Sequence, residues 1–447
     1  MRRDHLTTAA PPLRPLLTTK SYPARPAPAR NPVATTGESS PPDVGGAFTR
    51  TGLGRDTVGI GLLLILALLN AAGPLSIDTY LSAFPRMARD LGTGPTSIQL
   101  TLTTFMLGIG AGHLVIGALS DRWGRRGPLV LSLVVFTVAG ALCAVAPSVT
   151  ALIALRFVQG FAGSAGMVIG RAVVADSVRG RAAVQAYSLL AMVGALAPVV
   201  APVLGAALLP VLGWRGLFWC LVGVGALMVL AVVLGVQETL PAHRRTQGGL
   251  TETGRVAREV LSSRSFRGYT GAVVLAFGVL FAYVSASPFV VQDVLGLTPG
   301  QYAADFAVNS TALVIMGGLN ARLVLRVRPV RLLAVGLVGL GVAAVALLAL
   351  AATGATTTWA VLPLLFVVMA ATAMVFANGV GLAMDSVTSG LGTASAVIGA
   401  AQFGVGALVS PLVGLGGEHT AVPMAVVMSV CAAGALLSLR AARSARG

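Results

Sequence analysis

Long apolar runs, separated by short polar stretches, fill the chain from Val58 almost to its end. Each run has about 18 residues or more, which is the length that an α-helix needs to cross a bilayer. The runs do not show the regular polar and apolar alternation of membrane β-barrel strands. The pattern therefore predicts an all-α membrane protein with twelve transmembrane helices. They are expected near residues 58–83, 97–119, 128–146, 150–171, 183–209, 214–236, 268–291, 302–323, 330–351, 357–383, 391–416 and 420–440.

The longest connection between these spans, residues 237–267, divides them into six and six. It is polar and partly amphipathic, so it suits a linker that lies along a membrane surface. The first 55 residues are rich in proline, arginine and threonine and have no apolar core, which predicts disorder. The predicted organisation is a tail (1–55), an N-terminal six-helix bundle (56–236), the linker (237–267), a C-terminal six-helix bundle (268–441) and a short tail (442–447).

The composition supports the membrane assignment, because 55% of the residues are hydrophobic and 10% are charged. A soluble protein of 447 residues needs more polar surface than this. Cys143, Cys220 and Cys431 fall inside spans, without the spacing of a metal site or a disulfide framework. The sequence contains no nucleotide-binding P-loop, no H-E-x-x-H and no G-x-S-x-G pattern. We therefore expect no metal, no other cofactor and no enzymatic activity.

The net charge of +16 is distributed unevenly between the two sides of the predicted helices. With the spans in place, 27 of the 31 basic residues fall on the side that holds both termini and the linker. Positive charge marks the cytoplasmic side of a membrane protein, so both termini are predicted to be cytoplasmic. Orientation in the lipid bilayer therefore explains the positive charge, so the charge does not indicate a nucleic-acid partner and we expect none.

The stretch GALSDRWGRRGP, between the second and third spans, concentrates charge in a short turn. Its arginines fit the topology rule, but Asp121 does not, because acidic residues contribute little to that rule. A carboxylate at a helix end can accept hydrogen bonds from guanidinium groups and from a neighbouring helix N-terminus. Two glycines permit a tight turn and close helix approach. We predict a conformational latch that consists of Gly117, Asp121, Arg122, Gly124, Arg125 and Arg126.

These residues resemble the loop signature G-x-L-(S/A)-D-R-x-G-R-(R/K) of the major facilitator superfamily. LIALRFVQGFAGSAG resembles the motif in the fourth helix of that family, and GALAPVVAPVLG resembles the fifth-helix motif of its drug:proton antiporters. SIDTYLSAFPRMARDLG is similar to the first helix of the Bcr/CflA branch, which exports bicyclomycin and chloramphenicol. The resemblance implies two six-helix bundles around a central cavity and proton-coupled export of small drugs.

The fifth-helix motif contributes Gly194, Pro198, Pro202 and Gly205. The resemblance implies that they form a tight packing surface against the C-terminal half, which resists proton leak. The alternative is a helix that its prolines bend for packing alone. The chain departs from the family between the eighth and ninth spans, where GGLNARLVLRV carries no acidic residue. We therefore expect the N-terminal half to provide most of the latch.

Ionisable residues inside a membrane span are costly and are functional candidates by default. Asp78 is the acidic residue that we place well inside a span, and Arg156 lies at a similar depth. At a rise of about 1.5 Å per residue, both lie roughly 8 to 9 Å from the outer ends of their spans. Burial favours a neutral carboxyl group and a nearby arginine favours a charged one, so this pair can couple a proton to movement. The alternative is a static ion pair that holds two helices together.

Other side chains in the spans are candidates to face the cavity. The polar candidates of the C-terminal half, which could bind substrate together with Asp78 or simply bridge helices, are Tyr283, Ser287, Asn309 and Asn378. His113, in the second span, could relay protons or serve as a hydrogen-bonded packing residue. The candidates for an apolar wall are Phe105, Met106 and Phe281.

We predict a proton-coupled antiporter of the bacterial cell membrane that acts as a monomer and exports small, moderately lipophilic compounds. The resemblance implies phenicol-like or bicyclomycin-like substrates. One alternative is an exporter of an endogenous metabolite, such as an amino acid or a sugar. Another is a membrane sensor without transport, which would need a folded output domain that the sequence does not contain.

Overall fold

A computed structural model describes residues 59–178, 180–242, 245, 250–387, 391–417 and 419–443. These residues belong to a compact unit that begins at Gly54. The tail predicted for residues 1–55 lies outside the described residues, as do residues 444–447 of the predicted C-terminal tail.

The N-terminal half begins with α1 (Ile60–Asp78), which leads through a short 3-10 turn, η1 (Leu81–Ala83), into α2 (Phe84–Asp90). Three long helices follow, namely α3 (Pro95–Trp123), α4 (Arg126–Ala144) and α5 (Val149–Ser177). The last element, α6 (Gly180–Gly235), contains two spans, because the chain leaves helical geometry at Gly213, where φ is 64°. Glycine tolerates this positive φ since it has no Cβ. The interruption lies between the predicted spans 183–209 and 214–236.

The C-terminal half follows the linker helix α7 (Leu250–Ser262), a short amphipathic helix as expected for that segment. The first span is α8 (Arg264–Phe289), which ends in a π-helical turn, η3 (Val290–Val294). The remaining helices are α9 (Pro299–Leu323), α10 (Pro329–Thr353), α11 (Thr358–Met384), α12 (Leu391–Leu412) and α13 (Val422–Arg443).

In the described part of the chain, eleven helices are long and apolar enough to cross a membrane. Because the longest of them consists of two spans joined at Gly213, the number of spans is twelve. The described residues contain no β-strand. The prediction of a multi-pass, all-α membrane protein with two six-helix bundles is confirmed.

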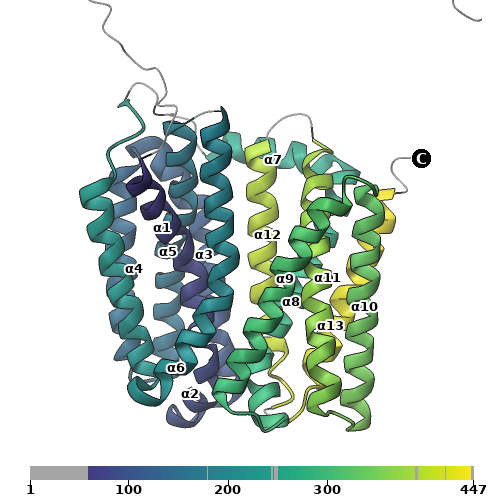
Figure 1. Ribbon diagram of the computed structural model, residues 1–447. Coiled ribbons are helices and arrows are strands. Elements are labelled where there is room, and N and C mark those ends of the chain that lie inside the picture. Colours follow the sequence, from purple (N-terminus) through teal and green to yellow (C-terminus); the bar gives the residue numbers. More distant parts are fainter. Residues whose placement is uncertain are drawn as a thin grey trace, which may run out of the picture. The chain divides into compact units, whose positions relative to one another are not determined.

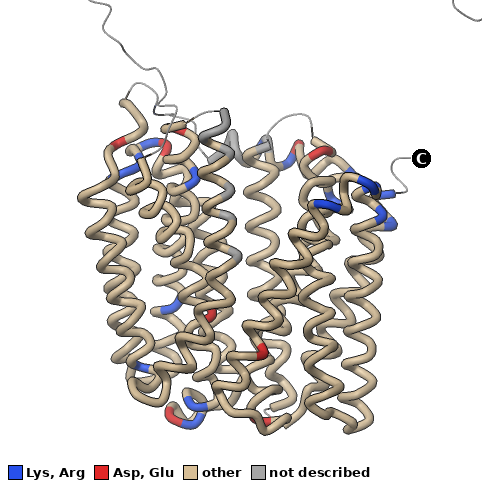
Figure 2. Tube along the Cα trace, in the orientation of Figure 1, with Lys and Arg blue, Asp and Glu red and all other residues tan. Residues whose placement is uncertain are grey.

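The two halves pack against each other mainly through two helix pairs. In Figure 1 the N-terminal half is coloured purple to teal and the C-terminal half green to yellow. The helix α3 contacts α12, and α6 contacts α9. Figure 2 shows that the arginines of the described residues gather at the end of the helices where the C-terminus lies, and that few lie at the opposite end.

Close approach between α3 and α5 depends on glycine. A Cβ atom at Gly160 would overlap the backbone of Phe105, and one at Gly108 would overlap the backbone of Phe157. Helices in a bilayer associate through such close packing because lipid and apolar side chains are alike in polarity. The two glycines therefore fix the distance between α3 and α5, which carry Phe105 and Arg156.

We predict that Gly160→Val destabilises the protein by about 1 to 3 kcal/mol, because the new side chain forces α3 away from α5. Thermal unfolding of the purified protein in detergent measures the effect. The matched control is Gly223→Val, since a Cβ at Gly223 meets no atom within 4 Å. Equal unfolding temperatures for the two variants would contradict this account of the α3–α5 contact.

Candidate functional site

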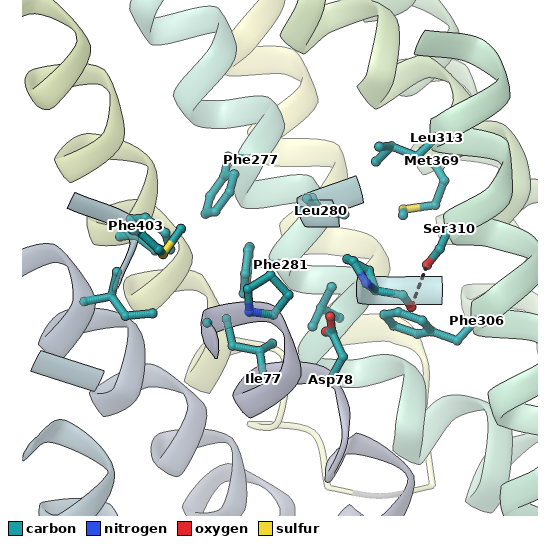
Figure 3. Close-up of a pocket in the computed structure, with 17 residues that line it drawn as sticks. Ile77, Asp78, Phe277, Leu280, Phe281, Phe306, Ser310, Leu313, Met369 and Phe403 are labelled. Atoms are coloured by element: carbon teal, nitrogen blue, oxygen red, sulfur yellow. Dashed lines mark hydrogen bonds between the residues drawn. The ribbon is translucent and has the colours of Figure 1, made fainter. Parts of the chain in front are cut away.

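A cavity of about 240 Å³ lies between the two halves. Its walls come from α1, α3, α5 and α6 on one side and from α8, α9, α11 and α12 on the other. Most of the lining is apolar, with Phe277, Phe281, Phe306 and Phe403 among the larger side chains. Figure 3 shows Asp78 among these apolar groups. The site is thus an apolar chamber that contains one acidic side chain among its lining residues.

Asp78 is the last residue of α1, and 5% of its surface is exposed. The position is held by α6, since a Cβ at Gly205 would overlap the carbonyl oxygen of Thr79, the next residue after Asp78. Among the described residues, Asp78 forms no ion pair. Its carboxyl group therefore lies in an apolar cavity without a fixed counter-charge. The charged form is costly in such a place, and binding of a proton removes that cost.

Arg156, on α5, is completely buried but does not pair with Asp78. Its Nη1 donates to Gln159 Oε1 at 2.7 Å and its Nη2 donates to the carbonyl oxygen of Ser76 at 2.9 Å. The guanidinium carbon lies 3.9 Å from the ring centre of Phe105 and 4.6 Å from that of Tyr80, a cation–π arrangement. The ion pair suggested by the sequence is absent from this conformation, because neutral oxygens and aromatic rings surround the guanidinium group.

The polar candidates of the C-terminal half do not line the central cavity. Asn309 Nδ2 donates to Tyr283 Oη at 3.0 Å, and the hydroxyl groups of Ser287 and Tyr302 lie 3.5 Å apart. Asn378 Nδ2 donates to Asn320 Oδ1 at 2.6 Å. These contacts are bridges between helices or within the packed interior, which is the alternative that the sequence left open for such residues.

The residues of α8 that line the cavity are apolar, so a search of the sequence for polar residues does not find them. Phe277, Leu280, Phe281 and Val284 line the cavity at intervals of three and four residues, so they occupy one face of the helix. Tyr283 and Ser287, one turn apart on α8, are completely buried and are not among the residues that line the cavity. On α9 the polar residue in the lining is Ser310, whose Oγ donates to the carbonyl oxygen of Pro198 at 3.3 Å (Figure 3).

The other candidates occupy different surroundings. Phe281 lines the cavity, whereas Phe105 packs on Arg156. Met106 meets α12 at Gly406, where an added Cβ would overlap its terminal methyl group. His113 Nδ1 lies 2.8 Å from the carbonyl oxygen of Ile109, and its ring centre lies 5.6 Å from that of Phe403. This environment fits the packing interpretation of His113.

The fifth-helix motif faces both the cavity and the neighbouring helices. Gly194 and Pro198 line the cavity, Pro202 is buried and Gly205 lies against the end of α1. The hydrogen bond from Ser310 to Pro198 joins the motif to α9 of the C-terminal half. The motif thus contacts the opposite half, in agreement with the surface that the resemblance implies, and the role in preventing proton leak stays a prediction.

One acidic residue that the sequence reasoning missed is Asp305, which is half-buried on α9. Its Oδ2 accepts a hydrogen bond of 3.0 Å from Asn309 Nδ2. The sequence does contain a signal for it, because Asp305 is an acidic residue inside the predicted span 302–323 and lies one turn before Asn309. Asp305 therefore belongs with Asp78 among the titratable groups of the spans.

The loop cluster between α3 and α4 is organised around Arg125, which is 8% exposed. Arg125 forms ion pairs with Asp121 and with Asp176 of α5, the second at 3.0 Å from Nε to Oδ2, and its Nη1 donates to Ser120 Oγ at 2.8 Å. Burial acts to lower the pKa of Arg125, but the hydrogen bonds with Asp176 and Asp121 outweigh it, so the pKa is raised. Arg122, by contrast, is exposed.

Glu238, just after α6, completes this cluster and was missed from the sequence. Its carboxylate accepts the backbone N–H groups of Arg125 (2.8 Å), Arg126 (3.2 Å) and Leu240 (2.9 Å). Burial raises the pKa of Glu238, but these backbone hydrogen bonds lower it by more, so the net pKa lies below the ordinary value. The resulting stabilisation is present at neutral pH and is lost as the pH falls through this lowered pKa.

The glycines of the cluster have different roles. Gly124 has φ 96°, and a Cβ there would overlap the carboxylate of Glu238. Gly117 lies close to Val168 of α5, because a Cβ added at Gly117 would lie 3.4 Å from Cγ1 of that valine. The contacts described here join α3, α5 and the residues after α6, all of them in the N-terminal half or at the start of the linker. The function as a latch between halves stays a prediction.

Hydrogen bonds join the two halves toward the end opposite to the basic residues. Gln99 Nε2 donates to the carbonyl oxygen of Ser285 at 3.2 Å, and Ser410 Oγ donates to the carbonyl oxygen of Gln99 at 3.3 Å. The hydroxyl groups of Ser285 and Ser410 lie 2.7 Å apart. These three residues come from α3, α8 and α12, so they join the two halves.

Comparison with known sequences identifies the class of protein. The sequence model of the Major Facilitator Superfamily matches residues 64–411. The chain therefore belongs to this superfamily and is a membrane transporter rather than an enzyme, as predicted.

The relatives include transporters with names that refer to drug resistance. YdgK of Bacillus subtilis (strain 168), described as an uncharacterized MFS-type transporter, is 36% identical over 375 residues, which cover 83% of this chain and 93% of that protein. A bicyclomycin resistance protein homolog of Haemophilus influenzae is 29% identical over 369 residues, which cover 83% of this chain and 92% of that protein. The multidrug resistance protein MdtL of Escherichia coli O9:H4 is 28% identical over 237 residues, which cover 53% of this chain and 60% of that protein.

A solved structure has the same fold. It is a bacterial homolog of the human lysosomal transporter Spinster, in an inward-facing and unoccupied conformation. The TM-score is 0.70 at 16% sequence identity, and the match covers 86% of this chain and 97% of the other.

We predict that Gly124→Ala destabilises the protein by more than about 1 kcal/mol, because alanine disfavours the positive φ and meets Glu238. The control is Gly127→Ala, three residues later, where a Cβ meets nothing within 4 Å. Thermal unfolding of both purified variants at neutral pH gives the comparison. A loss of stability in Gly127→Ala that matches the loss in Gly124→Ala would rule out the contact with Glu238 as the cause.

Proposed function

We propose that this transporter exports small, moderately lipophilic compounds in exchange for protons. The observation that carries the proposal is the acidic side chain of Asp78 in a mostly apolar cavity between the halves. A volume of about 240 Å³ lies just below the roughly 300 to 1,000 Å³ of typical ligand sites, which favours a small compound. The names of the relatives from Haemophilus influenzae and Escherichia coli support a drug as the substrate.

The proposed mechanism uses one carboxyl group in two conformations of the transporter. When the cavity opens to the outside, water reaches Asp78 and a proton binds to its carboxylate. The neutral carboxyl group can then be enclosed among apolar side chains, whereas the charged form would cost several kcal/mol without a partner. When the cavity opens to the cytoplasm, entry of the drug favours release of the proton. Exchange follows because the same site has different proton affinities in the two states.

Arg156 provides a fixed positive charge close to α1 in this scheme. Its Nη2 already contacts the backbone at Ser76, two residues before Asp78. A small movement or rotation at the end of α1 would exchange this neutral acceptor for the carboxylate. We propose that the ion pair forms in the inward-open state, where it would favour the charged form of Asp78 and the release of its proton.

We propose further that the basic end of the helices faces the cytoplasm of a bacterial cell and that the protein works as a monomer. The gathering of arginine at that end supports this orientation (Figure 2). Both termini and the linker 237–267 are then cytoplasmic.

The orientation predicts the result of cysteine labelling. In a variant without Cys143, Cys220 and Cys431, a cysteine at Ala242 should resist an impermeant thiol reagent added to intact cells, and one at Ala355 should react. Ala242 lies in the linker and Ala355 in the loop between α10 and α11, and both side chains are exposed. Labelling of Ala242→Cys with protection of Ala355→Cys would reverse the proposed topology.

The proposed mechanism predicts that Asp78→Asn abolishes uphill export driven by a pH gradient, because asparagine cannot exchange a proton. Asp78→Glu should retain part of the activity. The measurement is export by proteoliposomes under an imposed pH gradient, with chloramphenicol, bicyclomycin, ethidium, amino acids and sugars as test compounds.

The control for this experiment is Asp90→Asn. Asp90 is the last residue of α2, and its Oδ2 accepts a hydrogen bond of 3.0 Å from Trp214 Nε1. Uphill export by Asp78→Asn at the wild-type rate would assign proton coupling to another group. Export of amino acids or sugars but of no drug would replace the proposed substrate class.

A further inference from the structure

We propose that Asp305, Asn309 and Tyr283 form a second proton-binding site, in the C-terminal half, and that its proton is exchanged together with that of Asp78. The inference rests on the proposed proton-coupled function, and it assigns a group on α9 that the mechanism above does not use. The two carboxyl groups would then act from opposite halves, Asp78 from α1 and Asp305 from α9.

The three side chains form one hydrogen-bonded unit. Asn309 lies one turn after Asp305 on α9, and its Nδ2 donates to Asp305 Oδ2 at 3.0 Å and to Tyr283 Oη of α8 at 3.0 Å. Asn309 and Tyr283 are completely buried, whereas Asp305 is half-buried. The carboxyl group therefore lies at the edge of the packed interior.

The geometry of Asn309 suits both protonation states of Asp305. Its Oδ1 is buried and has no hydrogen-bond partner among the described atoms. A charged carboxylate accepts from Nδ2, as observed, while a protonated carboxyl group becomes a donor and needs an acceptor. If the amide turns over, Oδ1 can accept from the protonated carboxyl group and from the hydroxyl group of Tyr283. Binding of a proton then changes the direction of the hydrogen bonds and leaves the three side chains in place.

Asp305 has no ion pair that would fix it in the charged state, as judged from the described residues. The titratable groups nearby are the phenols of Tyr283 and Tyr302, and each interacts electrostatically with both Asp305 and Asp78. The helix α11 and the turn η1, which pack on α9, contain no titratable side chain, nor does α6 between residues 188 and 212. The turn η3 contributes Asp293.

An aromatic contact connects this unit to the cavity. The ring of Phe306, next to Asp305, stacks on Tyr283 with ring centres 5.4 Å apart and an interplanar angle of 20°. Phe306 also lines the cavity that contains Asp78, and Figure 3 shows both side chains at its wall. A compound that displaces Phe306 would move the stacked Tyr283 and change the hydrogen bond that Asn309 shares with Asp305. Occupancy of the cavity and protonation of Asp305 are therefore coupled.

The first test follows protonation directly and does not depend on a drug. Infrared difference spectra of the purified full-length protein are recorded as a function of pH, and the band of protonated carboxyl groups is followed. We expect Asp78→Asn to retain one titrating component of this band that the double variant Asp78→Asn, Asp305→Asn lacks. Identical spectra for the single and double variants at every pH would overturn the proposal.

Two further variants control for indirect effects. Asp90→Asn, at the same end of the protein but outside the unit, should leave the band of Asp305 unchanged. Tyr283→Phe keeps the ring stacked on Phe306 and removes the hydroxyl group that Asn309 contacts, so it should shift the midpoint of the Asp305 band. A Tyr283→Phe spectrum equal to that of wild type would also count against the hydrogen-bonded unit.

The second test measures coupling to the substrate. Chloramphenicol is added to the purified protein in weakly buffered solution, and the released protons are counted per bound molecule. We expect Asp305→Asn to release half as many protons as wild type, whereas equal release would exclude Asp305 from the exchange. If wild type releases none with any compound of the panel, the proposed antiport fails, and the infrared titration still decides whether Asp305 binds a proton.

Discussion

A charge inside a bilayer needs compensation, and this constraint determines where every ionisable side chain of the protein can lie. Most of the arginines lie at one end of the helices, where water or lipid headgroups can solvate them (Figure 2). Arg156 is the exception in the interior, and it is held by Gln159, the backbone of Ser76 and two aromatic rings. Asp78 has neither solvent nor a counter-charge, so a proton is the available means of neutralising it.

Much of the fold could be predicted from the sequence, because membrane helices carry their signal in consecutive apolar residues. The positions of the spans, the break near residue 213 and the amphipathic linker all follow from local patterns. The loop cluster was recognised from its motif, but Glu238 was not, because it reaches Arg125 from a distant part of the chain. Asp305 lies within a predicted span but close to its outer end, so depth in the membrane singles out Asp78 and not Asp305.

The lining of the cavity could not be predicted from polarity. The amide groups of Asn309 and Asn378 donate hydrogen bonds to Tyr283 and Asn320 within the packed interior, since a polar group buried without a partner is costly. The cavity face consists instead of large apolar residues at helical spacing, which in sequence look the same as residues that contact lipid. The ion pair between Asp78 and Arg156 is not formed in this conformation, for a related reason. Similar depth on two helices does not make two side chains face each other, and Arg156 is rotated toward the backbone of α1.

The two ends of the protein are held by different kinds of interaction. At the basic end, the carboxylates of Asp121, Asp176 and Glu238 bind Arg125 through charge-assisted hydrogen bonds, which tie α3, α5 and the residues after α6 together. At the opposite end, Gln99, Ser285 and Ser410 join the halves through neutral hydrogen bonds. Each neutral hydrogen bond contributes only about 0.5 to 1.5 kcal/mol, so this contact between the halves can break at modest cost. The strong interactions therefore preserve the shape of one half while the weak ones allow the halves to separate, which is the combination that alternating access requires.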